Sequence, residues 1–250
     1  MIGARVKLFL VVWLAGLPGV VVVTWQVVPV LLSASLAGRT LPLPMWVLQV
    51  ASGAQSALLL GLAVLIGVLL APKVHLAAPV LSALAEGRPA LELLRPQLLP
   101  GLIGGIAGAS ILVVVASVAP EPMHHLQPMV GLPAAAKLLY GGITEELMLR
   151  WGFMTLVIWL LWRSGQRGSG VPSAAVAWLG IGISALIFGI GHLPAASALF
   201  GGLSASVVAY VVAGNAAFGI IAGWLYARFG LESAMIAHAL THAFFLAVSR

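Results

Sequence analysis

Residues 8–36 read LFLVVWLAGLPGVVVVTWQVVPVLLSASL, a run of 29 residues without a charge. A helix needs about 20 predominantly apolar residues to cross the hydrocarbon core of a bilayer. Arg5 and Lys7 precede the run, as basic residues precede the apolar part of a secretory signal peptide. The apolar stretch is too long for such a peptide. We therefore expect an uncleaved first transmembrane helix.

The composition of the whole chain is that of an integral membrane protein. Of its 250 residues, 62% are hydrophobic and only 7% are charged, whereas soluble proteins carry about 25% charged residues. Only helices and closed barrels satisfy their backbone hydrogen bonds in lipid, and the apolar runs are longer than the ~10-residue alternating strands of a barrel. The composition predicts an all-α fold, a polytopic membrane bundle of about seven to eight transmembrane helices.

Polar, proline-rich or glycine-rich breaks divide the apolar sequence into expected spans. These are 8–36, 46–71, 98–119, 130–162, 172–192, 203–226 and 231–249. An eighth, re-entrant or broken helix can form near 193–202. The mixed-charge segment 73–97 is expected to connect two spans along the membrane surface.

The net charge of +6 is scattered along the chain and does not form the basic patch of a nucleic-acid surface. Basic loops in a membrane protein report orientation. With a cytoplasmic N-terminus, one side receives most of the basic residues, namely Arg5, Lys7, Lys73, Arg88, Arg95, Arg163, Arg167 and Arg228. The chain has no cysteine, which excludes disulfides, thiol nucleophiles and thiolate metal sites.

Two of the six acidic residues, Glu145 and Glu146, stand side by side inside the expected span 130–162. An ionisable group at membrane depth costs about 3 kcal/mol on insertion scales and is normally retained for function. Glu146 and Arg150 are four residues apart and face each other on a helix, so we expect a structural ion pair. Glu145 is rotated by about 100° and is free to point into a cavity as a general base. The alternative is an inert buried network.

Three histidines occur in two later apolar segments. His238 and His242 are four residues apart, the spacing with which two imidazoles on one helix face hold a metal ion, although either ring can simply bond to a neighbouring carbonyl. His192 ends the sequence Phe188-Gly189-Ile190-Gly191-His192, where a lone histidine is more often a capping or interfacial residue. The carboxylates at 145 and 146 favour a shared functional site for all three.

Other polar residues are assigned lesser roles. His124 and His125 are expected in a solvated loop, and Asn215 is expected to form a hydrogen bond between helices. The chain has no aspartate and no Gly-x-Ser-x-Gly motif, so a Ser-His-Asp triad is excluded.

The order of three motifs resembles the CAAX protease and bacteriocin-processing (CPBP) family, also called the CAAX prenyl protease or Abi family. They read Glu145-Glu146-Leu147-Met148-Leu149-Arg150, Phe188-Gly189-Ile190-Gly191-His192 and His238-Ala239-Leu240-Thr241-His242. The third motif of the family usually ends in asparagine, whereas this chain has His242. An imidazole there can replace the amide as a hydrogen-bond donor or add a metal ligand.

We expect one integral membrane domain, 1–250, in which 1–129 supplies N-terminal helices. The resemblance covers about residues 130–249 and implies that this part is a catalytic core. The implied activity is that of an intramembrane endopeptidase, which hydrolyses a peptide bond of a membrane-associated peptide or protein. Its implied site residues fall into three roles: Glu145 and His192 activate water, His238 and His242 stabilise the oxyanion or help to position the water, and Glu146, Arg150 and Phe188 support the site.

The resemblance leaves a zinc requirement open. Glu145 with His192, His238 and His242 would satisfy a Zn²⁺ site, and a metal-free glutamate-type hydrolase is equally compatible with these residues. The expected partners are membrane lipids and a peptide or protein substrate, without nucleic acid. The composition favours a bacterial or archaeal cell membrane. The same residues also suit a proton- or ion-coupled transporter, or a non-catalytic scaffold or immunity protein.

Overall fold

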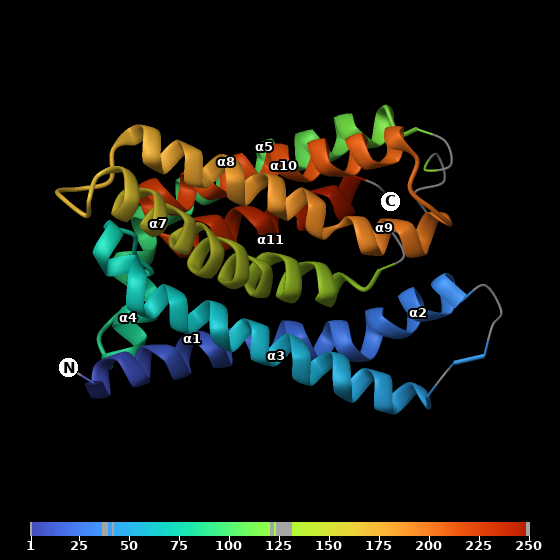
Figure 1. Cartoon of the computed structure of the whole chain (residues 1–250), viewed down its shortest axis with the longest axis horizontal. Helices are drawn as coiled ribbons and strands as arrows, with labels where there is room; N and C mark the ends of the chain where they lie inside the picture. The colour runs from blue at the N-terminus through green and yellow to red at the C-terminus, as the bar shows by residue number, and fades with distance from the viewer. Residues whose placement is uncertain (1, 37–39, 42, 121–122, 124–131, 249–250) are drawn as a thin grey trace.

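The computed structural model describes residues 2–36, 40–41, 43–120, 123 and 132–248 (Figure 1). The expected loop residues His124 and His125 lie outside these ranges. Within them the secondary structure is helical and contains no strand, which confirms the predicted all-α bundle. The first membrane-length helix combines α1 (Ile2–Val22), the π-helical η1 (Val23–Val27) and α2 (Val28–Leu36).

The remaining helices follow in chain order. Those before the charged motif are α3 (Met45–Leu70), η2 (Ala71–Val74), α4 (Pro79–Ala85) and α5 (Leu91–Ser117). The motif lies on η3 (Ala136–Glu145) and η4 (Leu147–Met154), which continue into α7 (Thr155–Gly165). The last four are α8 (Ala174–Gly191), α9 (Leu193–Phe200), α10 (Ala205–Phe229) and α11 (Leu231–Val248).

Six helices in the described part of the chain are long and apolar enough to cross a membrane. They are Gly3–Leu36, Met45–Val74, Leu91–Ser117, Ala174–Phe200, Ala205–Phe229 and Leu231–Val248. A seventh long helical run, 136–165, carries the Glu-Glu-Arg motif. The helix expected near 193–202 is α9, which follows α8 directly at His192 and is part of the same membrane-length segment.

The seven long segments alternate in direction, so the first turn of α1 and the last turn of α11 lie toward opposite ends of the bundle (Figure 1). The end that holds the start of α1 also holds α4, the starts of α5, α8 and α11, and the end of α10. The basic residues assigned to one membrane side lie on α1, η2, α5, α10 and the adjoining end of α7, and in the connections that follow α4 and α7. They therefore gather at one end of the bundle, as the charge pattern predicts.

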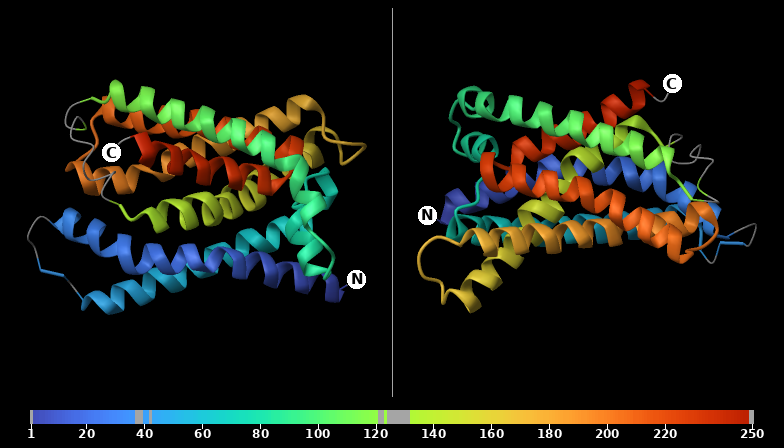
Figure 2. Two further views of the ribbon diagram at one scale, coloured as in Figure 1. Left: turned by 180° about the vertical axis from the view of Figure 1, so that it is seen from behind. Right: turned by 90° about the horizontal axis from the view of Figure 1, so that it is seen from above.

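Small residues allow the helices around the site to pack closely. α5 and α11 run side by side (Figure 2), and Gly101 and Gly105 of α5 face Ile236 and Leu240 of α11. A side chain at either glycine would collide with its neighbour on α11. This is the close approach that small residues provide in membrane helices. It holds the histidine-bearing helix against α5.

The helical run 136–165 lies in the hydrophobic core. Leu147, Trp151, Met154 and Ile158 on this run are almost fully buried. They belong to a cluster that joins α1, α3, α8, α10 and α11. Glu146 of the motif is likewise held in the interior of the bundle, where its side chain is 0% exposed.

The connection between α3 and α5 is helical and tied to α11. The backbone N–H of Leu81 on α4 donates to Oε1 of Glu232 at 2.9 Å, and that of Ser233 donates to Oε1 of Gln97 at 3.0 Å. Both acceptors are buried. α5 begins at Leu91, earlier than the expected 98, because Glu92 and Arg95 lie on its exposed first turns.

Candidate active site

The Glu-Glu-Arg motif lies on a backbone with π-helical hydrogen bonding. η3 and η4 are both π-helical, and the N–H of Glu146 between them bonds to the carbonyl of Ile143. Gly142 brings η3 against the backbone of Ala239 on α11, where a Cβ would come within 3.1 Å of the Ala239 Cα. The motif and the histidine pair of α11 are thus neighbours.

Glu146 and Arg150 form the predicted ion pair. Nη1 of Arg150 lies 3.1 Å from Oε1 of Glu146, and the two side chains are 1% and 0% exposed. Nη2 of Arg150 also donates to the carbonyl of Gly219 at 3.3 Å, and its Cζ lies 4.6 Å from the ring centroid of Phe188. Arg150 therefore joins the motif helix to α8 and α10.

Glu146 has a second partner that the sequence spacing did not predict. Its Oε1 lies 2.7 Å from Nδ1 of His238, a residue 92 positions away. An ionised carboxylate can only accept, so Nδ1 carries the proton in this hydrogen bond. In the neutral ring Nε2 of His238 is then a hydrogen-bond acceptor. Glu146 consequently orients a histidine as well as neutralising Arg150.

Glu145 takes the position expected for the residue without the arginine partner. Its side chain is 17% exposed, and its Oε2 lies 3.9 Å from Nε2 of His238. This separation is too long for a direct hydrogen bond. His192, the imidazole implied as the partner of Glu145, is not within ion-pair distance of it. The histidine beside Glu145 is His238.

The three predicted histidines meet at one small cavity. Its volume is about 40 Å³, and its lining residues are Leu112, Phe188, His192, Gly214, Asn215, Phe218, His238, Thr241 and His242. A buried water needs roughly 10–15 Å³ of such space and two to four polar partners. The cavity is thus large enough for water and has polar groups to hold it. Glu145 is not among the lining residues.

Aromatic contacts fix the orientation of the imidazoles. The rings of His238 and His242 stack with centroids 5.1 Å apart. Phe188 makes edge-on contacts with His192 at 4.8 Å and with His238 at 5.8 Å, while Phe218 lies 4.7 Å from His238. Phe188 therefore contacts two of the histidines and also carries Arg150 on its ring face.

The backbone sets the tautomer of His192. Its Nδ1 lies 2.8 Å from the carbonyl oxygen of Phe188. A carbonyl only accepts, so Nδ1 donates and Nε2 of the neutral ring is left as an acceptor. His192 and His238 are both held at Nδ1, and each retains Nε2 for a reacting water or for an oxyanion after protonation.

Asn215 is a cavity residue that the sequence did not assign to the site. Its Nδ2 donates to the carbonyl of Val211 on its own helix at 2.8 Å, so the expected bond between helices is not observed. The remaining N–H and Oδ1 of the amide are not used in that bond. In the sequence, Asn215 is recognisable only as a polar residue within an apolar helix. That pattern is equally compatible with a residue that has no role in the site.

The predicted zinc ligands do not form a metal-binding set in the described part of the chain. No group of three or more histidines and glutamates lies in a suitable arrangement there. His238 presents one ring nitrogen to Glu146 and the other toward Glu145, whereas His192 is anchored to Phe188.

Comparison with known proteins identifies one family. The family model for the type II CAAX prenyl endopeptidase Rce1-like proteins matches residues 128–244. This range contains all seven predicted site residues, from Glu145 to His242. No curated protein and no solved structure matches the chain.

Proposed function

We propose that this chain, whose residues 128–244 match the model of the type II CAAX prenyl endopeptidase Rce1-like family, is an intramembrane endopeptidase of that family with Glu145 as the general base. The observation that carries the proposal is the meeting of three imidazoles at one small cavity beside the adjacent carboxylates. Carboxylates and imidazoles in reach of water are the groups that activate a nucleophile and stabilise an oxyanion.

Water activation is assigned to the space between Glu145 and the histidines. A water beside Oε2 of Glu145 can donate one proton to this carboxylate and the other to an imidazole nitrogen. His238 is the imidazole closest to it in the structure, at 3.9 Å, and Nε2 of His192 is a second acceptor. Transfer of the proton to Glu145 leaves hydroxide to attack the scissile carbonyl carbon.

Oxyanion stabilisation is assigned to His238, His242 and Asn215. Nε2 of His238 donates to the oxyanion when the ring enters the reaction protonated, and the attacking water then forms its second hydrogen bond to Nε2 of His192. The spare N–H of Asn215 is a further donor in the same cavity. Preorganised donors of this kind lower the barrier to acyl transfer because charge develops on the carbonyl oxygen.

The Glu146–Arg150 pair supports this chemistry without contact with substrate. Arg150 is bound to the carbonyl of Gly219 and lies on the ring of Phe188, so it holds the motif helix against α8 and α10. Glu146 fixes the position and tautomer of His238. A misplacement of about 1 Å in such a supporting group can reduce the rate about 100-fold.

The proposed substrate is a membrane-associated peptide or protein, since the cavity lies within a bundle of membrane-length helices. We also propose a bacterial or archaeal cell membrane, with the N-terminus and the basic end of the bundle on the cytoplasmic side.

Cleavage by purified protein in detergent tests the proposed activity. The substrates are a quenched peptide library and peptides that end in a CAAX sequence with a prenylated cysteine. Wild type is compared with Glu145→Gln and with Glu92→Gln, a control that removes an exposed carboxylate on α5. We expect at least a 100-fold loss of cleavage in Glu145→Gln only. Undiminished cleavage by Glu145→Gln would refute the assignment of the base.

Elemental analysis of the active protein tests the metal alternative. Stoichiometric zinc that is lost in His238→Ala would establish a metalloprotease, and active protein without zinc would establish the metal-free hydrolase. Liposomes containing wild type test the transporter. Proton-driven uptake without any cleavage would replace the peptidase proposal.

A further inference from the structure

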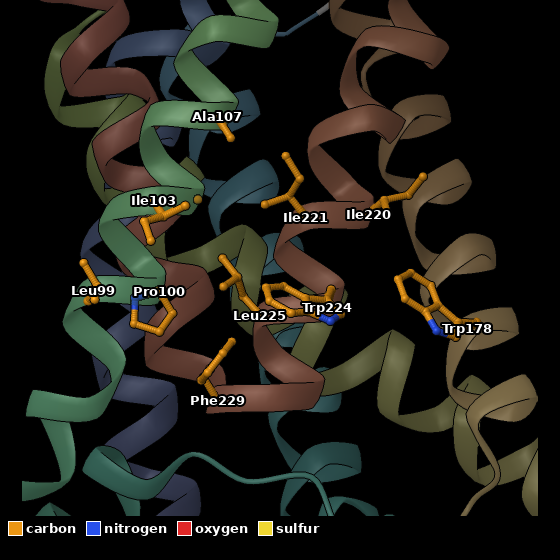
Figure 3. A pocket seen from close by; sticks show the side chains of 11 residues that line it. Leu99, Pro100, Ile103, Ala107, Trp178, Ile220, Ile221, Trp224, Leu225 and Phe229 are labelled. Carbon is orange, nitrogen blue, oxygen red and sulfur yellow. The ribbon is translucent and has the colours of Figure 1, made fainter.

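A large apolar groove lies outside the histidine cavity, on the face formed by α5, α8 and α10 (Figure 3). Its volume is about 440 Å³, within the roughly 300–1,000 Å³ of ligand pockets. It is lined by Leu99, Pro100, Ile103, Gly104, Ala107, Trp178, Ile220, Ile221, Trp224, Leu225 and Phe229. These side chains are apolar apart from the two indole N–H groups. The groove is therefore suited to a hydrocarbon chain.

Small residues and tryptophans shape this groove. Gly104 and Ala107 on α5 leave room between this helix and α10, and Leu225 covers Gly104. Trp178 on α8 and Trp224 on α10 remain 53% and 42% exposed, and Figure 3 shows Trp178 on the side of α10 away from α5 and Trp224 next to Leu225. Tryptophan is enriched where a membrane helix meets the lipid headgroups.

Two arginines lie at one end of the groove. Arg95 precedes Leu99 by four residues on α5, one turn before the first lining residue of that helix, and Arg228 on α10 lies between the lining residues Trp224 and Phe229. Both are exposed and belong to the basic end of the bundle. Neither guanidinium forms an ion pair or hydrogen bond with another part of the described chain. Two cations thus lie on the helices that line the groove, near the start of α5 and in the last turn of α10.

We propose that this groove binds one anionic phospholipid, with an acyl chain along α5 and α10 and the phosphate between Arg95 and Arg228. An apolar channel that ends in two unpaired cations matches the distribution of polarity in such a lipid. Basic pockets between membrane helices bind anionic headgroups, and each arginine near the surface contributes about 1 kcal/mol. The site shares no lining residue with the histidine cavity, so it does not depend on the proposed peptidase activity.

Native mass spectrometry of the detergent-solubilised protein tests the headgroup contact. Phosphatidylglycerol and phosphatidylcholine with identical acyl chains are added separately, and the bound fraction is measured. We expect tighter binding of phosphatidylglycerol, weakened about fivefold by Arg95→Gln or Arg228→Gln and about 25-fold by both. The matched control is Arg5→Gln/Lys7→Gln, which removes two exposed charges at the same end of the bundle and leaves binding unchanged. Equal binding of both lipids, or binding unaffected by the arginine substitutions, would overturn the proposal.

A second variant tests the acyl-chain contact. Ala107→Phe places a ring in the groove and is expected to lower binding of phosphatidylglycerol at least tenfold, whereas Val114→Phe, at a 62% exposed position outside the groove, leaves it unchanged. Thermal unfolding of both variants verifies that they are folded. Retained binding in folded Ala107→Phe would overturn the placement of the chain. Displacement of the lipid by a prenylated peptide, with no effect of the arginines, would instead assign the groove to a lipid-modified substrate.

Discussion

The adjacent glutamates should separate stability from catalysis. Glu146 is fully buried, and one of its oxygens contacts both Arg150 at 3.1 Å and His238 at 2.7 Å. Glu145 is 17% exposed, and no direct hydrogen bond joins it to His238. We therefore predict that Glu146→Gln lowers thermal stability, while Glu145→Gln abolishes cleavage at nearly wild-type stability.

The magnitude follows from the contacts that each substitution removes. Loss of one partner from a buried ion pair costs about 3–5 kcal/mol because the other charge is left uncompensated. The glutamine amide oxygen at 146 can keep one neutral hydrogen bond of about 1 kcal/mol, so we expect a net loss of about 2–4 kcal/mol. For a chain of this size the loss corresponds to a decrease in Tm of about 4–16 °C. Glu145→Gln should change Tm by less than about 4 °C.

Thermal unfolding in detergent at one fixed scan rate measures this difference, since membrane proteins often unfold irreversibly. The double variant Glu146→Gln/Arg150→Met removes the uncompensated guanidinium together with the carboxylate. It should therefore recover part of the lost Tm. An equal decrease in Tm for Glu145→Gln and Glu146→Gln, or a double variant less stable than Glu146→Gln, would refute the asymmetric assignment of the two carboxylates.

Three further predictions test the geometry around the cavity and at the surface. Asn215→Ala should lower kcat about 100-fold with little change in KM if the amide contacts the oxyanion, and an unchanged kcat would exclude that contact. Gly141→Ala places a Cβ 3.1 Å from Nε2 of His242 and should reduce kcat at least tenfold. The control is Gly182→Ala, whose Cβ meets no other atom within 4 Å and should leave kcat unchanged. Similar kcat values for both variants would contradict the close contact with His242. Glu232→Ala removes the carboxylate that accepts from the N–H of Leu81 on α4, which should lower the stability of this contact by about 1–3 kcal/mol. Amide hydrogen exchange in residues 79–85 should therefore accelerate, while cleavage persists. Unchanged exchange would show that this hydrogen bond is not needed to hold α4.

Local sequence features predicted the parts of this protein that depend on short-range physics. Long uncharged runs indicate membrane helices because lipid cannot hydrate a backbone or a charge. The four-residue spacing of Glu146 and Arg150 predicted their ion pair because these positions are neighbours on one helix. Both features depend on neighbours within one or two turns, and both are present in the structure.

The assignment of partners between helices required the tertiary structure. The sequence motifs pointed to Glu145, His192, His238 and His242 as a group, but spacing within a helix carries no information about the rotation of one helix against another. The close approach of Gly142 to Ala239 brings Glu146 to Nδ1 of His238. It also makes His238 the imidazole beside Glu145.

Asn215 and the groove on α5 and α10 likewise became visible only from packing. The sequence cannot distinguish a polar residue that lines a cavity from one that forms a hydrogen bond with its own helix backbone. Asn215 does both. The sequence by itself determined a membrane-embedded helical bundle with an acidic motif and three histidines, because hydropathy and helical periodicity are local properties. Only the tertiary structure decided which carboxylate orients which histidine, because the relative rotation and separation of packed helices depend on side chains far apart in the chain.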